Sequence, residues 1–172
     1  MKKCIIILFS SVLLATTITI PTDYPTIQEG IIQSSDGDTV LVLPGTYIEL
    51  LDYQGRDIVV GSLYLTTADT SYIGLTIVDA LLCGSVVTFD SGETAAAELV
   101  GLTITHGSGT NSENQVCGGG IFCLWSSPTL RAVSIESNGI IGSTAIGGGI
   151  YIWAAENMQI IDSRIFWNSG YA

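Results

Sequence analysis

The sequence predicts an all-β protein whose short strands wind into a parallel β-helix, and three observations favour this fold. Segments rich in Val, Ile and Thr, which are strand formers, alternate with Gly, Ser, Asn and Asp, which are turn formers. Related segments recur about every 30 residues in the second half of the chain. Beyond residue 34, no segment has a strong helical periodicity.

The folded part is expected to open with a short helix. Thr26 and Glu29 have the spacing of a capping box, in which each side chain satisfies a free backbone donor of the first helical turn. Ile27, Ile31 and Ser34 would then share one face. Together these features predict a helix of about two turns.

A series of strands is expected to follow this helix. Residues 39–43 (TVLVL) are apolar at nearly every position, as expected for a strand covered on both faces, and Pro44-Gly45 ends it. Further strand candidates lie at residues 58–60, 63–65, 75–78, 86–89, 99–105 and 121–123. Each of them is too short to form a core alone, so neighbouring units must stack.

A repeat of 29 to 30 residues indicates how the strands are arranged. The segment 118–123 (GGGIFC) recurs as 147–152 (GGGIYI), 133–138 (VSIESN) recurs loosely as 163–168 (SRIFWN), and 102–107 is an earlier relative. Helical repeats are excluded because no unit has a 3.6-residue face, and the Leu-x-x-Leu-x-Leu ladder of leucine-rich repeats is absent. A parallel β-helix remains, in which successive coils lie about 4.8 Å apart.

Equivalent residues would then stack into ladders. The pairs expected to line the interior are Ile121 with Ile150, Cys123 with Ile152, and Ile135 with Ile165. Asn138 over Asn168 would form an amide ladder at a turn, each side chain bonding to its neighbour or to turn backbone.

The N-terminus has the pattern of a secretory signal peptide. Met1-Lys2-Lys3 is a short positive start, and residues 4–15 (CIIILFSSVLLA) form the apolar stretch, with cleavage expected after Ala15 or Thr17. An uncleaved anchor is the alternative, but the stretch falls short of the ~20 apolar residues that a spanning helix needs. We therefore expect residues 1–17 to be a signal peptide, residues 18–172 to form the β-helix domain, and no integral membrane span after cleavage.

The charge composition argues against two classes of binding partner. Five Lys and Arg oppose 16 Asp and Glu, for a formal net charge of -11. This balance argues against nucleic acid and against anionic lipid, because no cationic patch is available to meet phosphate groups.

The cysteines beyond the leader are Cys83, Cys117 and Cys123. A disulfide between Cys117 and Cys123, around the three glycines, is the alternative to buried free thiols. Buried thiols are favoured, because Cys123 falls at an inward strand position. No His or second CxxC accompanies the cysteines, so we expect no metal and no cofactor.

Two families resemble this sequence. Residues 25–47 are similar to the N-terminal cap and first strand of secreted right-handed parallel β-helix proteins of the pectin-lyase-like superfamily, in which the helix plugs the open end of the cylinder. Residues 119–121, 148–150 and 166–168 resemble the GGAI and FxxN repeats of bacterial surface β-helix proteins, such as polymorphic outer membrane proteins. Here Gly replaces Ala, and the FxxN spacing is one residue short. The resemblance implies a right-handed β-helix that is secreted or lies on the bacterial cell surface.

The last repeat ends just before Ala172 without a capping segment. Because an uncovered coil presents unpaired strand edges, we expect a β-helix truncated at its C-terminus, which continues in a longer protein or pairs end-on with another chain.

The superfamily includes pectate lyases, pectin methylesterases and polygalacturonases, which differ in the catalytic side chains that their reactions need. A lyase needs an Arg or Lys base beside clustered carboxylates that hold Ca²⁺, whereas Arg56, Arg131 and Arg164 have no Asp pair beside them. Of the polygalacturonase motifs only His106-Gly107 remains, and His106 is the sole histidine. We therefore predict no catalytic residue in this chain.

Aromatic residues give a binding function more support. Strand alternation turns Phe122 outward with Tyr151 above it, and Trp125 and Trp153 follow closely. A row of exposed rings suits sugar rings, although the same rings also serve to pack under turns. The sequence thus predicts a secreted or cell-surface β-helix with a binding or structural role that contacts polysaccharide through this aromatic face. The alternative is a lyase or glycoside hydrolase acting on acidic polysaccharide, with its catalytic site in further coils.

Overall fold

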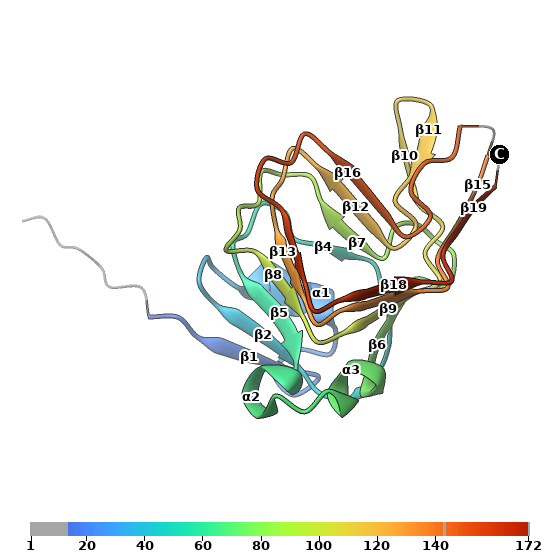
Figure 1. Ribbon diagram of the computed structural model, residues 1–172. Helices are drawn as coiled ribbons and strands as arrows, with labels where there is room; N and C mark the ends of the chain where they lie inside the picture. Colours follow the sequence, from blue (N-terminus) through green and yellow to red (C-terminus); the bar gives the residue numbers. More distant parts are fainter. Residues whose placement is uncertain (1–13, 143, 172) are drawn as a thin grey trace, which may run out of the picture.

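A computed structural model describes residues 14–142 and 144–171 (Figure 1). The strands are β1 (Thr17–Ile20), β2 (Thr39–Val42), β3 (Gly45–Ile48), β4 (Leu51–Asp52), β5 (Val59–Ser62), β6 (Thr76–Asp79), β7 (Val87–Phe89), β8 (Glu98–Val100), β9 (Thr103–Thr105), β10 (Thr110–Ser112), β11 (Gln115–Cys117), β12 (Ile121–Leu124), β13 (Thr129–Arg131), β14 (Ser134–Glu136), β15 (Gly139–Ile141), β16 (Ile150–Trp153), β17 (Gln159–Ile161), β18 (Arg164–Phe166) and β19 (Ser169–Tyr171). The helices are α1 (Ile27–Gln33), α2 (Tyr64–Thr67) and α3 (Ser71–Leu75).

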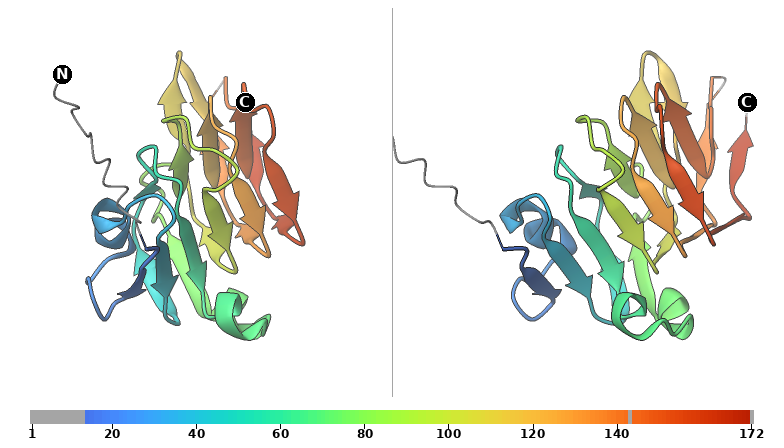
Figure 2. Two further views of the ribbon diagram at one scale, coloured as in Figure 1. Left: turned by 90° about the vertical axis from the view of Figure 1, so that its left-hand side faces the viewer. Right: turned by 60° about the vertical axis from the view of Figure 1, so that its left-hand side comes forward.

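Three parallel sheets surround one hydrophobic core, as Figures 1 and 2 show. Sheet 1 has the order β1-β2-β5-β8-β13-β17, sheet 2 has the order β18-β14-β9-β6-β3, and sheet 3 has the order β16-β12-β7-β4. Each complete coil therefore adds one strand to each sheet on top of the previous coil, whereas β1 belongs to sheet 1 alone and the last described coil adds β17 to sheet 1 and β18 to sheet 2. The fold is a parallel β-helix with a few short helices, which confirms the predicted fold class.

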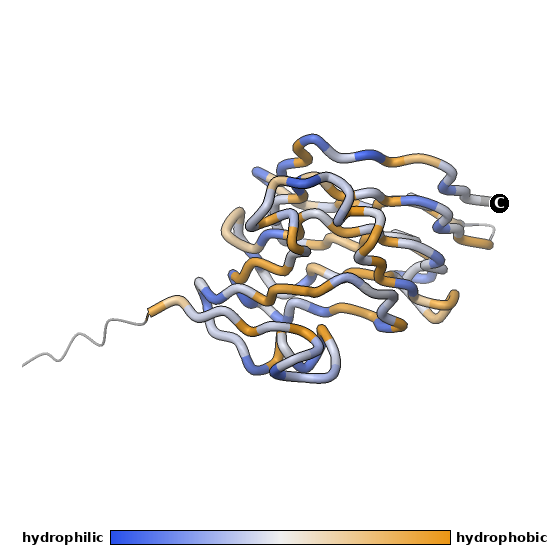
Figure 3. The backbone as a smooth tube through the Cα atoms, turned by 90° about the horizontal axis from the view of Figure 1, so that it is seen from below, coloured by the Kyte–Doolittle hydropathy of each residue, from blue (hydrophilic) through white to orange (hydrophobic). Residues whose placement is uncertain are grey.

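The register of the strands follows the sequence repeat. Ile121 lies opposite Ile150 and Cys123 opposite Ile152 in sheet 3, and Ile135 lies opposite Ile165 in sheet 2. The first member of each pair is fully buried. In the last described coil, Ile152 is 44% exposed and Ile165 is 50% exposed, because no described coil covers them. Along the chain, hydrophobic and hydrophilic stretches alternate in each coil (Figure 3).

An amide ladder closes the corner that follows sheet 2. The Nδ2 group of Asn138 donates to Oδ1 of Asn168 at 3.0 Å and to the carbonyl oxygen of Ile104 at 3.1 Å. Its Oδ1 accepts the backbone N–H of Gly107 at 2.8 Å. Asn138 is 1% exposed, so one buried amide joins three successive coils.

Helix α1 lies across the core at the N-terminal end of the stack (Figures 1 and 2). Thr26 is its N-cap, and its side chain accepts the backbone N–H of Glu29 at 3.1 Å, which confirms one half of the predicted capping box. The other half is wrong, because the carboxylate of Glu49, rather than that of Glu29, accepts free N–H groups of the first turn, those of Ile27 and Gln28. Ile27 and Ile31 are buried in the common core. The helix therefore covers apolar side chains that would otherwise face solvent.

Strand β1 was not among the predicted strands. Its residues follow the apolar leader directly, so the sequence pattern does not separate them from it. Residues 1–13 of the predicted leader lie outside the described part of the chain, whereas Thr17 is the first residue of β1 and pairs with Thr39.

Three predicted strands differ from the structure. Residues 63–65 belong to a helical segment, in which the N–H of Thr67 donates to the carbonyl of Leu63. Residues 99–105 form two strands, because Gly101 has a positive φ of 67° and turns the chain between β8 and β9. The outward side chains of β2 are half-buried rather than covered, so only one face of this strand lies in the core.

Candidate functional site

The connection between sheet 1 and sheet 2 differs in one coil. Four of these connections are two residues long, but residues 63–75 form a 13-residue insertion between β5 and β6. This insertion contains α2 and α3, which lie outside the coils, α2 against β5 of sheet 1 and α3 beside β6 and β9 of sheet 2 (Figure 1). It forms a wall that the other coils lack.

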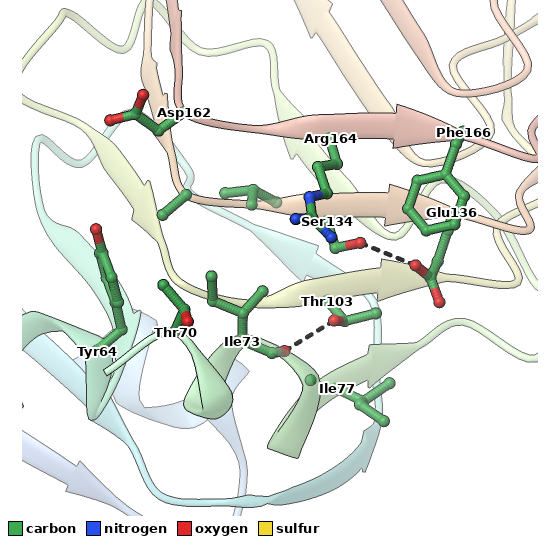
Figure 4. A pocket seen from close by; sticks show the side chains of 13 residues that line it. Tyr64, Thr70, Ile73, Ile77, Thr103, Ser134, Glu136, Asp162, Arg164 and Phe166 are labelled. Atoms are coloured by element: carbon green, nitrogen blue, oxygen red, sulfur yellow. Dashed lines mark hydrogen bonds between the residues drawn. The ribbon is translucent and has the colours of Figure 1, made fainter. Parts of the chain in front are cut away.

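A groove of about 590 Å³ lies between this wall and the outer face of sheet 2 (Figure 4). Its floor includes an in-register row of side chains from β6, β9, β14 and β18, namely Ile77, Thr103, Ser134 and Arg164. Tyr64, Thr70 and Ile73 line it from the insertion, and Glu136, Asp162 and Phe166 line it from the later coils. We call this the sheet 2 groove.

Close packing holds the wall against the floor. The hydroxyl of Thr103 donates to the carbonyl oxygen of Ile73 at 2.8 Å, and the Oγ of Ser62 accepts the N–H of Tyr64 at 3.1 Å. A Cβ at Gly101 would lie 2.7 Å from the Cβ of Tyr64 and 2.8 Å from the Oγ of Ser62. The approach of α2 to the coils therefore needs glycine at residue 101, where φ is also positive.

The groove combines apolar surface with charged groups. Tyr64 and Phe166 provide aromatic rings, while Glu136, Asp162 and Arg164 provide charges. The hydroxyl of Ser134 donates to Oε2 of Glu136 at 2.8 Å and orients that carboxylate. Arg164 is exposed and forms no ion pair within residues 14–142 and 144–171, so its guanidinium is available to an acceptor on a ligand.

The other arginine of these coils is engaged elsewhere. The Nη2 of Arg131 lies 2.8 Å from Oε2 of Glu98, in a partly exposed ion pair between adjacent strands of sheet 1. Arg131 does not line the sheet 2 groove.

The predicted aromatic face is only partly exposed. Phe122 and Tyr151 stack with ring centroids 5.6 Å apart and planes 10° apart. Phe122 is 2% exposed, so the prediction that it offers its ring to a ligand is wrong. Burial raises the pKa of the half-buried Tyr151, and the nearby Cys117 and Glu113 of the β10–β11 hairpin raise it further. This hairpin, which was not among the predicted elements, thus lies beside the rings.

The two tryptophans of the predicted face are exposed. Trp125, which directly follows β12, is 68% exposed, and Trp153, the last residue of β16, is 58% exposed. The backbone N–H of Trp125 donates to the carbonyl oxygen of Trp153 at 3.0 Å. The predicted row therefore divides into a stacked pair, in which Phe122 is buried and Tyr151 half-buried, and an exposed pair.

His106 pairs with an aspartate outside the sheet 2 groove. Its Nδ1 lies 2.9 Å from Oδ2 of Asp79. Partial burial opposes ionisation of Asp79, but the hydrogen bonds from His106 and from the N–H of Leu81, together with the charge of His106, outweigh it and lower the pKa of the carboxyl. His106 has a φ of 52° at the turn after β9, and this pair orients the turn.

The three described cysteines, Cys83, Cys117 and Cys123, are free thiols. Cys117 and Cys123 are buried, which confirms the favoured prediction for these two residues. Burial raises the pKa of Cys123 to about 12. Cys83 is exposed, which contradicts the prediction of a buried thiol, because it lies in a turn after two left-handed residues, Leu81 and Leu82.

Within the described residues, no three or more His, Cys, Asp and Glu side chains gather as a metal site would require. In the same residues, no helix has the length and apolar character needed to cross a bilayer. No protein-family model, no curated protein and no solved structure matches the chain.

Most of the sheet 2 groove has no signal in the amino-acid sequence. The repeat aligns Arg164 with Ser134 and so indicates a shared row. The wall was missed because residues 63–75 interrupt the repeat.

Proposed function

We propose that this protein is an exported β-helix, of the kind found in the pectin-lyase-like superfamily and among bacterial surface proteins, and that it binds polysaccharide in the sheet 2 groove. The observation that carries the proposal is the groove itself, which extends over several coils and has aromatic rings from two different segments. An elongated ligand with alternating apolar and hydroxyl-bearing surfaces fits such a shape.

Each part of a sugar chain has a suitable partner there. The rings of Tyr64 and Phe166 offer flat apolar faces to the C–H surface of a pyranose. The guanidinium of Arg164 can donate two parallel hydrogen bonds to a carboxylate or hydroxyl pair, and Glu136 can accept from a hydroxyl. Function in a β-helix depends on such side chains rather than on the fold.

A glycan panel tests this proposal with the full chain. We expect at least one polysaccharide to bind, and we expect Arg164→Ala and Phe166→Ala each to weaken its binding about tenfold or more, equivalent to about 1.4 kcal/mol. Arg131→Ala is the matched control, since it removes an arginine outside the groove. The proposal fails if no glycan is retained, or if the groove variants bind as tightly as the control.

The same panel addresses the enzymatic alternative. Unsaturated products or new reducing ends released from pectate or alginate, and lost in Arg164→Ala, would favour the lyase or hydrolase function instead.

The proposed export predicts a specific mature N-terminus. The N–H of Thr16 donates to Oδ1 of Asp38 at 2.7 Å, and Thr17 begins β1. Cleavage after Ala15 would leave these contacts intact, whereas cleavage after Thr17 would remove them. Mass spectrometry of protein secreted by a bacterial host should therefore find Thr16 as the first residue, and an uncleaved cytoplasmic chain would contradict the export proposal.

A further inference from the structure

A second hollow, of about 530 Å³, lies at the turns between sheet 3 and sheet 1. Trp125, Thr94, Glu156 and Asn157 line it, and it shares no lining residue with the sheet 2 groove. We call it the Trp125 hollow.

Folding does not account for a tryptophan at this position. The strand register places residue 125 level with Ala154 in the next coil and with Gly55 two coils earlier. All three have positive φ, at 54°, 55° and 75° respectively. A left-handed backbone is unfavourable for a bulky residue, and an indole that is 68% exposed buries little apolar surface. The exposed ring is therefore available for contact with a ligand in the hollow.

Polar side chains beside the indole are free to bind. The Oγ of Ser127 accepts the backbone N–H groups of Glu156 and Asn157 at 3.0 and 3.3 Å, which fixes their turn. In the described part of the chain, the side chains of Glu156 and Asn157 make no hydrogen bond of their own, and both are exposed. The Glu156 carboxylate and the Asn157 amide are thus free to form hydrogen bonds with a ligand at the edge of the hollow.

The charged side chains that line the hollow are all negative. Its lining contains the carboxylates of Glu93 and Glu156 and no cationic side chain. Glu93 is 2% exposed and accepts from the N–H of Gly55 at 2.7 Å and from the hydroxyl of Ser126 at 2.7 Å, so it is fixed in the wall. An anionic sugar would be repelled here, and a cationic one would be attracted.

We propose that the Trp125 hollow binds a protonated amino sugar, such as a glucosamine unit of a deacetylated chitin chain. The indole of Trp125 stacks on the pyranose face, the ammonium group lies beside the Glu156 carboxylate, and Asn157 contacts hydroxyls. A flat ring and hydroxyl partners favour a sugar over a lysine-rich peptide, which shares only the positive charge. This site is independent of the polysaccharide proposed for the sheet 2 groove.

Calorimetry on the full chain tests the proposal with four probes, namely a glucosamine hexamer, an N-acetylglucosamine hexamer, a cellohexaose and hexalysine. At roughly pH 6, where carboxylates are ionised, we expect the glucosamine hexamer to bind at least tenfold more tightly than the other three. Higher salt should reduce this preference. Trp125→Ala should lose tenfold or more in affinity, and Glu156→Gln should lose the preference for the free amine.

Two controls keep the test specific. Alanine already occupies the equivalent turn position at residue 154, so Trp125→Ala should fold, and its far-ultraviolet circular dichroism should match the wild type. Trp167→Ala removes a tryptophan that is 80% exposed and lies outside the hollow, and it should bind like the wild type.

Three results would overturn the proposal. They are equal affinity for the acetylated and free-amine hexamers, unchanged binding in Trp125→Ala, and hexalysine binding as tight as that of the glucosamine hexamer. Arg164→Ala should not affect these measurements, so failure here is separate from failure of the sheet 2 groove.

Discussion

Removing the buried amide of Asn138 tests the corner that joins three coils. In Asn138→Ala, the N–H of Gly107 loses its acceptor, and because Gly107 is buried, this costs about 1–3 kcal/mol. The Nδ2 bonds to Ile104 and Asn168 are lost as well, each worth about 1 kcal/mol. We expect a total loss of about 3 kcal/mol in unfolding free energy, since part of this is recovered by relaxation. A chain of this size should then melt about 6–12 °C lower.

Asn168→Ala is the matched control for this prediction. Asn168 is half-buried in the last described coil, so water can replace most of its partners, and we expect a loss of about 1 kcal/mol. Urea unfolding followed by circular dichroism measures both variants under identical conditions. A loss below about 0.5 kcal/mol in Asn138→Ala, typical of an ordinary surface substitution, would refute the reasoning. Equal losses in the two variants would refute it as well.

Three further predictions concern packing, acid stability and thiol reactivity. A Cβ at Gly119 would lie against the carbonyl oxygen of Gly148 in the next coil, so Gly119→Ala should lower the free energy of unfolding by about 3 kcal/mol or more. Gly74→Ala in α3, where a Cβ meets open space, should be neutral or stabilising by up to about 1 kcal/mol, and thermal melts that rank the two variants otherwise would contradict this. The N–H groups of Ser35 and Thr16 lower the pKa of Asp38 from its ordinary 3.8, so its contribution to stability is present above that value and is lost as the pH falls through the lower, folded pKa. Asp38→Asn should therefore flatten the acid limb of a stability–pH curve, and parallel curves for variant and wild type would count against this linkage. Iodoacetamide should modify the exposed Cys83 in the native chain and reach Cys123, with its pKa of about 12, only after unfolding; mass spectrometry that finds both modified equally in the native chain would disprove this.

The predictability of the candidate sites differs from residue to residue. Arg164 and Ser134 are equivalent positions of the repeat, so their shared row could be found in the sequence. The apposition of Tyr64 to that row could not, because it depends on the helical insertion packing over Gly101. Likewise, the alternation of side chains along the strand correctly predicted that Phe122 points out of the core, but it did not indicate the β10–β11 hairpin beside it.

The amino-acid pattern alone determined the parallel β-helix, its capping helix, the stacking of Ile121 on Ile150 and the Asn138–Asn168 ladder. The coils and their ladders repeat along the chain, and each coil can bury its apolar residues only against an equivalent coil, whereas the helix has its own capping signal in Thr26. The tertiary structure decided what lies outside the coils. Whether an outward side chain is covered, exposed or part of a groove depends on which insertion folds over it, and such contacts join segments that have no repeating relation in sequence.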